Sequence, residues 1–80
     1  MDNVENRLVR CFSSVFPELG EGEIRNASIE SVPAWNSLAA VTLAAVLQEE
    51  FGIQVNLADL PSLVSFAAVQ DYVRHNHVPS

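Results

Sequence analysis

The sequence predicts an all-α fold: a small four-helix bundle of three main helices and one short helix, with a long loop between helices one and two. Two observations support this prediction. Apolar residues recur at helical spacing near both ends of the chain. Between them lies an almost wholly apolar run that starts after a capping residue, Asn36, and stops at Gly52. No segment shows a convincing strand pattern.

Eighty residues predict a single domain, 1–80, with order over about 3–76 and a tail over 77–80. The apolar share of 49% is enough for one core and argues against intrinsic disorder. A domain of this size has little room for an active-site cleft of its own. We therefore expect a non-catalytic protein, whose chemistry comes from a partner or an attached group.

The charge balance is acidic, with ten carboxylates against four arginines, no lysine and a net charge of −6. Such a surface repels nucleic acid and anionic lipid. No segment has the apolar length of a membrane span, and the start of the sequence lacks the pattern of a secretory signal. A single cysteine, Cys11, permits no internal disulfide. We expect a cytoplasmic monomer.

The first predicted helix ends at Phe16, because Pro17 disfavours helical geometry in the residue before it. Asp2 is placed to cap this helix, with Glu5 as the second half of a capping box. One buried stripe is expected to contain Val4, Leu8, Cys11, Phe12, Val15 and Phe16.

Residues 17–35 lack a sustained period and are predicted to form the long loop. Four apolar residues are expected to pack it inward: Leu19, Ile24, Ile29 and Val32. Trp35 has two interpretations of equal weight, because an aromatic residue before a helix cap can fasten the loop to the bundle or contact a partner.

The second main helix is predicted over 37–51. A helix that is apolar all round cannot be buried on every side in so small a domain, so part of it is expected to be a docking surface. We place Phe51 and Val41 on its inward side, and we also count Val41 among the residues that a partner reaches.

A short turn capped by Asn56 is predicted through Leu60, where Pro61 interrupts it. Ser65 then caps the last helix, and the chain is expected to fray from His75 onward. His75 and His77 lack the companions that a metal site needs, so no metal is expected. The inner stripe of the last helix is expected to contain Phe66, Val69, Tyr72 and Val73.

Four stretches together resemble acyl carrier proteins, and the resemblance runs from Ala27 to the end of the chain. The tripeptide Asn36-Ser37-Leu38 alone is a weak signal, but it becomes specific when a Glu-Glu-Phe-Gly helix end follows at the right distance. The stretches are Ala27-Ser28-Ile29, Asn36-Ser37-Leu38, Glu49-Glu50-Phe51-Gly52-Ile53 and Ala67-Ala68-Val69-Gln70-Asp71-Tyr72-Val73.

The resemblance implies that Ser37, flanked by Asn36 and Leu38, carries 4′-phosphopantetheine, installed from coenzyme A by a phosphopantetheinyl transferase. The thiol of this arm would hold acyl or aminoacyl groups as thioesters for loading and processing enzymes. The residue-level interpretation agrees, because the first turn of a helix favours an attached phosphate. No neighbouring base is evident that would make Ser37 a nucleophile by itself. The partner surface is predicted to comprise Trp35, Val41, Glu49 and Glu50.

The chain departs from typical fatty-acid carriers in its charge. Asn36 stands where those carriers have aspartate, and Ala39, Thr42 and Gln48 replace acidic residues on the docking helix. A partner that binds an acidic helix through a basic patch would find less to contact. The sequence around Trp35 is closer to free-standing carriers of polyketide or other specialised biosynthesis. The alternative is a carrier-like bundle that is not modified and serves as an interaction module.

Overall fold

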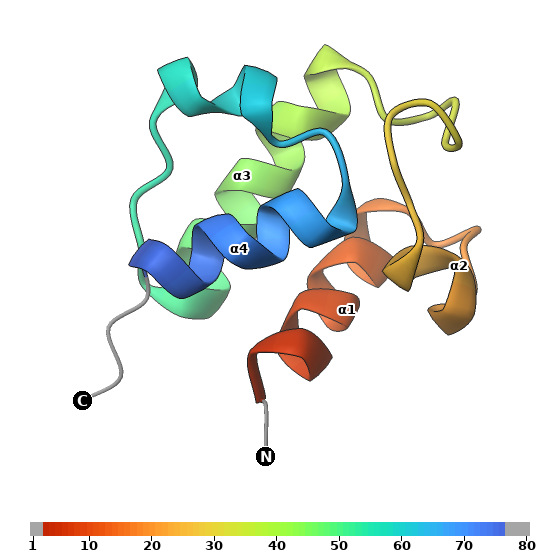
Figure 1. Ribbon diagram of the computed structural model, residues 1–80, viewed down its shortest axis with the longest axis horizontal. Helices are drawn as coiled ribbons and strands as arrows, with labels where there is room; N and C mark the ends of the chain where they lie inside the picture. The colour runs from red at the N-terminus through yellow and green to blue at the C-terminus, as the bar shows by residue number, and fades with distance from the viewer. Residues whose placement is uncertain (1–2, 77–80) are drawn as a thin grey trace.

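The computed structural model describes residues 3–76 and is helical throughout most of this range (Figure 1). Its elements are α1 (Asn3–Val15), α2 (Glu21–Arg25), α3 (Ser37–Phe51), the 3-10 helix η1 (Leu57–Ser62) and α4 (Phe66–Asn76). Among the described residues there is no strand, only an isolated antiparallel bridge between Ser28 and Ser65. The all-α prediction is confirmed.

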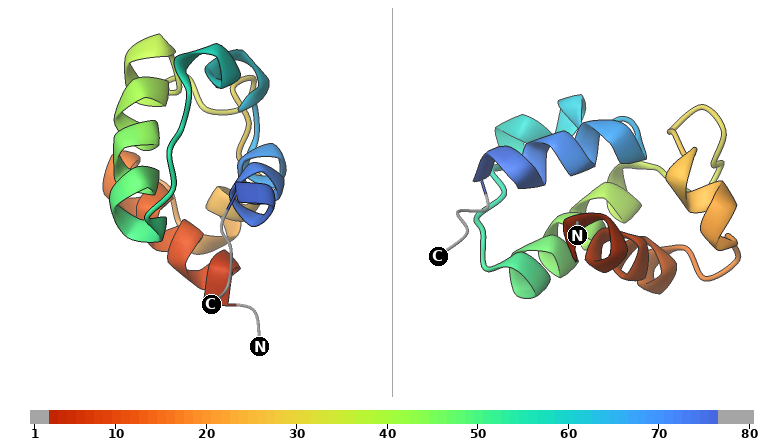
Figure 2. Two further views of the ribbon diagram at one scale, coloured as in Figure 1. Left: turned by 90° about the vertical axis from the view of Figure 1, so that its left-hand side faces the viewer. Right: turned by 60° about the horizontal axis from the view of Figure 1, so that its bottom comes forward.

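The helices enclose one core (Figure 2). Helix α1 packs against α2, α3 and α4, and η1 packs against α3. In the left view of Figure 2, α3 and α4 stand on two sides of the molecule, with η1 at one end and α1 towards the other. The start of α3 therefore lies near the η1 end of the bundle, away from most of α1.

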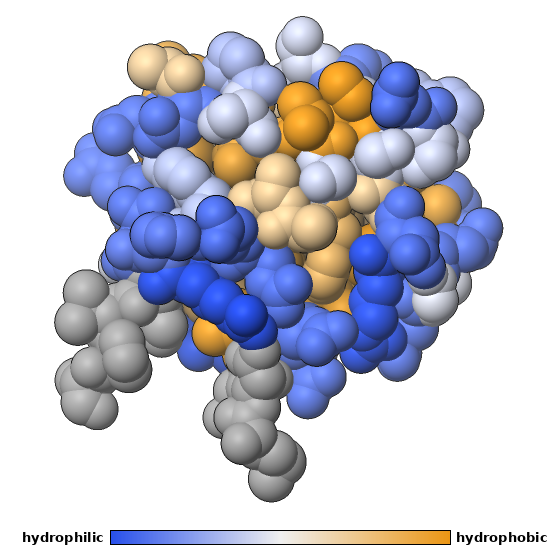
Figure 3. Space-filling view, in the orientation of Figure 1, coloured by the Kyte–Doolittle hydropathy of each residue, from blue (hydrophilic) through white to orange (hydrophobic). Residues whose placement is uncertain are grey.

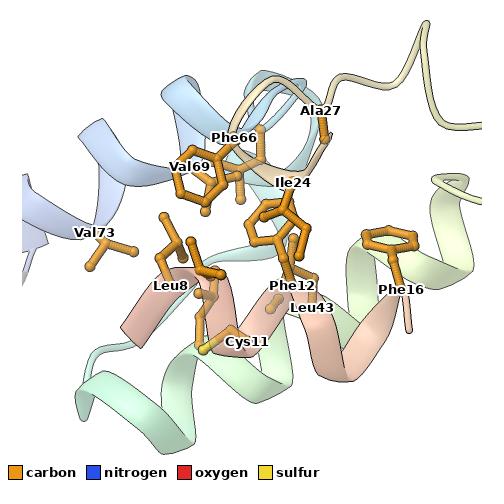
Figure 4. Packing of buried hydrophobic residues seen from close by; sticks show 14 of the residues in the cluster. Leu8, Cys11, Phe12, Phe16, Ile24, Ala27, Leu43, Phe66, Val69 and Val73 are labelled. Atoms are coloured by element: carbon orange, nitrogen blue, oxygen red, sulfur yellow. The ribbon is translucent and has the colours of Figure 1, made fainter. Parts of the chain in front are cut away.

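Helix α1 supplies the centre of the core (Figure 4). Leu8, Cys11 and Phe12 are buried as predicted, and Val9, which the predicted stripe omitted, is buried as well. The ring of Phe12 lies 5.1 Å from that of Phe66, measured between centroids. Core contacts of this kind, between aromatic rings from distant parts of the chain, fix the arrangement of the helices.

Trp35 belongs to this aromatic cluster. Its ring centroid lies 5.4 Å from that of Phe12 and 5.7 Å from that of Phe16, and the residue is only 5% exposed. Of its two interpretations, the one that fastens the loop to the bundle is therefore right. The prediction that Trp35 belongs to the partner surface is wrong, because almost none of its surface is open to a partner.

The long loop contains a helix that the sequence did not predict. The backbone N–H of Gly20 donates to Glu23 Oε1 at 2.9 Å, and Arg25 Nε lies 2.7 Å from Glu5 Oε2 of α1. Ile24 is 1% exposed and anchors α2 on α1. Of the other residues expected to pack inward, Val32 is buried and Leu19 is partly buried, but Ile29 is 46% exposed. That part of the prediction is wrong.

Helix α3 begins and ends where the sequence predicted. Asn36 Oδ1 accepts a hydrogen bond from Ala39 N at 3.0 Å. Gly52 has a φ of 65°, the left-handed conformation that glycine adopts without steric penalty, and its N–H donates to Gln48 O. Val41 is 47% exposed, so its placement on the inward side is wrong. The buried side is formed by Leu43, Ala44, Leu47 and Phe51.

The last helix starts with the predicted cap, since Ser65 Oγ accepts a hydrogen bond from Ala68 N at 3.1 Å. Its inner stripe is confirmed for Phe66, Val69 and Val73, which are buried. Tyr72 is partly buried, and its hydroxyl donates to Asp59 Oδ2 at 2.7 Å, which ties η1 to α4.

Helix α4 continues to Asn76, so the predicted fraying does not begin at His75. The predicted tail, 77–80, and the predicted cap, Asp2, lie outside the described residues. None of the helices described here combines the length and apolar character needed to cross a membrane.

Candidate functional site: the start of helix α3

Ser37 is the first residue of α3, and its side chain is exposed. The start of a helix leaves four N–H groups without an intrahelical partner. Here Asn36 N donates to Ala34 O, and Ala39 N donates to the Asn36 side chain. The N–H groups of Ser37 and Leu38 remain as donors beside the Ser37 hydroxyl.

The charge around Ser37 favours an anion. No charged residue occurs between Glu30 and Glu49, so the first turns of α3 contain no carboxylate. The aligned peptide dipoles of a helix give its N-terminus a partial positive charge. A phosphate on Ser37 would therefore meet backbone N–H donors and no carboxylate on the same turns of the helix.

An apolar hollow of about 250 Å³ adjoins Ser37. Figure 3 shows apolar residues at the surface in this region, over η1 and the start of α3. The backbone N–H of Ile29 donates to Val64 O at 3.0 Å, which holds two of the walls together. The lining residues come from the loop, α3 and the η1 region: Ile29, Trp35, Asn36, Ser37, Ala40, Leu60, Pro61, Leu63 and Val64.

Comparison with protein families identifies this region. Residues 35–73 match the family described as a phosphopantetheine attachment site. A search of curated proteins found no match to the chain. The match confirms the predicted cofactor and is consistent with the predicted resemblance to acyl carrier proteins. A phosphopantetheine-carrying domain also implies a phosphopantetheinyl transferase and biosynthetic enzymes as partners.

The geometry fits a phosphopantetheine attachment site. The matched segment begins at Trp35 and runs through α3, η1 and most of α4, so it includes the start of α3 and most of the hollow. The exposed hydroxyl of Ser37 is open to an enzyme, and the free N–H groups can orient a phosphodiester. The apolar walls offer a surface on which the first part of an arm can lie.

The other predicted site residues are spread along α3. Leu38 and Val41 lie within the first two turns and are 76% and 47% exposed. Glu49 and Glu50 lie at the far end, about 18 Å from Ser37 at the rise of an α-helix. Glu50 Oε2 pairs with Arg7 Nε of α1 at 2.7 Å. The structure thus separates the two predicted acidic contacts from Ser37.

Sequence reasoning missed the part of the hollow formed by Leu60, Pro61 and Val64. These three residues lie in or just after η1, and the bridge between Ser28 and Ser65 brings the loop beside them. The sequence does contain one signal for this part of the hollow. The Ala27-Ser28-Ile29 stretch is part of the resemblance to acyl carrier proteins, although the resemblance assigns it no role.

Three titratable groups outside this region have raised pKa values: Cys11, Arg25, through its hydrogen bonds to Glu5 and Glu21, and Tyr72. Burial raises the pKa of the Cys11 thiol to about 11, with a further contribution from the Glu50 carboxylate. Cys11 is therefore protonated at neutral pH, and its 3% exposure agrees with the predicted core role. The hydrogen bond to Asp59 raises the pKa of the Tyr72 hydroxyl. None of the three lines the hollow beside Ser37.

Proposed function

We propose that this chain is a carrier protein whose Ser37 is esterified by 4′-phosphopantetheine. The observation that carries the proposal concerns the hydroxyl groups of the matched segment. Four of them are engaged in hydrogen bonds: Thr42 with Leu38 O, Ser62 with Asp59 O, Ser65 with Ala68 N, and Tyr72 with Asp59 Oδ2. Within residues 3–76, the Ser37 hydroxyl alone among these five has no hydrogen-bond partner, and it is exposed.

The attachment reaction requires little of the chain itself. The Ser37 oxygen bonds to the pantetheine-side phosphorus of coenzyme A, the bond from this phosphorus to the bridging oxygen breaks, and adenosine 3′,5′-bisphosphate leaves. The hydroxyl proton passes to a base of the transferase. The chain presents the hydroxyl, and the N–H groups of Ser37 and Leu38 orient the phosphate. When attached, the arm supplies a thiol that holds acyl or aminoacyl groups as thioesters.

We further propose that the chain is a cytoplasmic monomer without catalytic activity, and that residues 1–80 form one domain. Ser37 is acted upon by partner enzymes, and His75 is not among the residues that line the hollow beside it. The uncharged start of α3 favours fatty-acid-like, polyketide or other specialised biosynthesis over a role with enzymes that bind acidic carriers.

The test is intact-mass spectrometry of the full chain after incubation with coenzyme A and a broad-specificity phosphopantetheinyl transferase. We expect one arm on the wild type, none on Ser37→Ala, and one on the matched control Ser62→Ala. A wild type that stays unmodified with several such transferases would exclude the proposal and favour the unmodified interaction module.

A further inference from the structure

The Trp35 side chain lies between the hollow beside Ser37 and the aromatic core. It lines the hollow, yet the residue is only 5% exposed. Its ring contacts those of Phe12 and Phe16, and neither phenylalanine lines the hollow. Trp35 N donates to Val32 O at 3.0 Å, so the backbone is held as well. The indole is therefore fixed in place close to Ser37.

The indole N–H of Trp35 is a hydrogen-bond donor without an acceptor. Among the described residues, 3–76, its nitrogen makes no hydrogen bond to the protein. No side-chain nitrogen or oxygen in this range is both unpaired and sealed from solvent. The Trp35 nitrogen is unpaired, so it must reach an opening of the surface. Buried tryptophans usually pair this group, and an unpaired donor on so enclosed a side chain points to a ligand.

The other walls of the hollow provide few donors. Ile29 N donates to Val64 O and Leu63 N to Leu60 O, each at 3.0 Å, so these backbone groups are already used. Most of the remaining wall is aliphatic side chain. A polar group that enters such a hollow loses hydration, which costs free energy unless a hydrogen bond replaces the water. A ligand that fits the hollow is therefore largely apolar, with an acceptor for the Trp35 N–H.

The arm proposed for Ser37 meets these requirements. It begins at a phosphate on the Ser37 oxygen and continues as alkyl groups joined by amides. Ser37 itself lines the hollow, so the first part of the arm starts at its wall. The aliphatic walls can cover the alkyl groups, and an amide carbonyl can accept the Trp35 N–H. The thiol lies at the far end of the arm, so this contact leaves the thiol free to reach partner enzymes.

We propose that Trp35 is a binding residue for the arm: its indole N–H donates to an amide carbonyl of the 4′-phosphopantetheine on Ser37 and holds the first part of the arm in the hollow. The inference rests on the proposed function and adds to it a residue and a binding site. The phosphate is not the assigned acceptor, because the N–H groups of Ser37 and Leu38 lie beside it at the start of the helix.

The first experiment observes the indole N–H directly. The chain contains a single tryptophan, so this group gives one signal in a nitrogen–proton correlation spectrum. The full chain is compared before and after arm attachment, which intact-mass spectrometry verifies. We expect the Trp35 signal to move on attachment, and exchange of its proton with deuterated water to slow about fivefold, equivalent to about 1 kcal/mol. Ser37→Ala, treated in the same way, should show neither change.

The second experiment observes the arm. Coenzyme A that is isotope-labelled in its pantetheine part gives amide signals from the arm alone. On the wild type we expect these signals to be displaced from those of free labelled coenzyme A, and Trp35→Phe, which keeps an aromatic ring but removes the donor, should return them towards the free positions. Phe16→Leu is the matched control, because it alters the same aromatic cluster but does not line the hollow. It should leave the arm signals displaced.

Three results would overturn the inference. They are an indole signal that does not respond to the arm, equal effects of the Trp35 and Phe16 variants on the arm signals, and a Trp35→Phe effect confined to the phosphorus signal. Circular dichroism checks the fold of each variant, and the wild-type comparison decides the question without any substitution. An unmodified wild type would instead exclude the proposed function, whereas a modified wild type with an unchanged indole signal excludes only the contact with Trp35.

Discussion

The two ends of α3 are built differently. At its start, Ser37 and Leu38 are exposed, and the helix is held by the Asn36 cap. At its end, Phe51 is 5% exposed, and the guanidinium of Arg7 lies 4.6 Å from the centroid of its ring. Arg7 also bonds to the side chain and the backbone carbonyl of Glu50.

The end of α3 is also joined to the loop that follows it. Gln48 Oε1 accepts a hydrogen bond from Val55 N at 2.9 Å, and Gly52 ends the helix in the left-handed conformation. One end of the helix is thus fixed to α1 and the loop, whereas the other is open to a partner. An enzyme can cover Ser37 without disturbing the contacts that hold α3 in the bundle.

The largest expected effect tests the fixed end. Phe51→Ala removes a buried aromatic ring and the partner of the Arg7 guanidinium, so it should lower the free energy of unfolding by about 3–5 kcal/mol. Urea denaturation followed by circular dichroism measures this loss. Ser37→Ala at the open end should lower it by less than about 1 kcal/mol. Comparable losses would show that the two ends do not differ as described.

A second effect concerns Cys11, which lies under the end of α3 beside Val46 and Glu50. Its pKa is raised from 9.0 to about 11 in the folded chain. As pH rises, the unfolded state therefore loses its thiol proton before the folded state does. The contribution of the protonated thiol to the free energy of unfolding is complete below about pH 9. It is lost as pH rises to about 11, by about 2–3 kcal/mol in total. Urea titrations give the free energy of unfolding of the wild type and of Cys11→Ala at each pH. The difference between the two proteins should change by that amount between about pH 9 and pH 11. Parallel curves would show that the thiol is not buried in solution.

A third effect concerns the cap at the open end. Asn36→Ala removes the acceptor for Ala39 N and should lower the free energy of unfolding by about 1 kcal/mol. Asn36→Asp keeps an oxygen at that position and should leave stability nearly unchanged, since both residues cap equally well. Thermal unfolding of the three proteins under one buffer condition provides the comparison. A loss in Asn36→Asp as large as in Asn36→Ala would contradict the role of the side-chain oxygen.

The smallest effect is expected at Leu38. A residue that is 76% exposed contributes little to the core, so Leu38→Ala should change the free energy of unfolding by no more than about 0.5 kcal/mol. The same urea titration measures it. A loss above about 1 kcal/mol would mean that Leu38 stabilises the bundle, and that the open end is less independent of the core than the structure indicates.

The sequence predicted the bounds of α3 well, because a capping asparagine and a left-handed glycine are local signals. It could not predict which side of α3 is buried. When nearly every residue of a helix is apolar, as around Val41, no stripe distinguishes the core from the surface. Helix α2 was missed because a helix of five residues is too short to be stable alone and is held here by Ile24 and by the Arg25 pair with α1.

The candidate site was predictable in part. Ser37, Asn36 and Leu38 are adjacent in sequence, so a short motif was enough to place them. The hollow depends on contacts between the loop and the segment before α4, which no local pattern reports. Trp35 was equally ambiguous, because only its distances to Phe12 and Phe16 assign it to the core.

The bridge between Ser28 and Ser65 has a consequence for the order of folding. Phe66 N donates to Ala27 O at 2.9 Å and Ile29 N to Val64 O at 3.0 Å. These hydrogen bonds join two segments that are far apart in the chain, and we call this junction the neck. Closing a flexible loop of roughly forty residues costs about 3 kcal/mol of chain entropy, and few contacts at the neck itself offset this cost. We therefore expect the neck to form late, after α1, α3 and α4 have collapsed on their aromatic core. The hollow beside Ser37, whose walls the neck joins, would then be among the last features of the molecule to assemble.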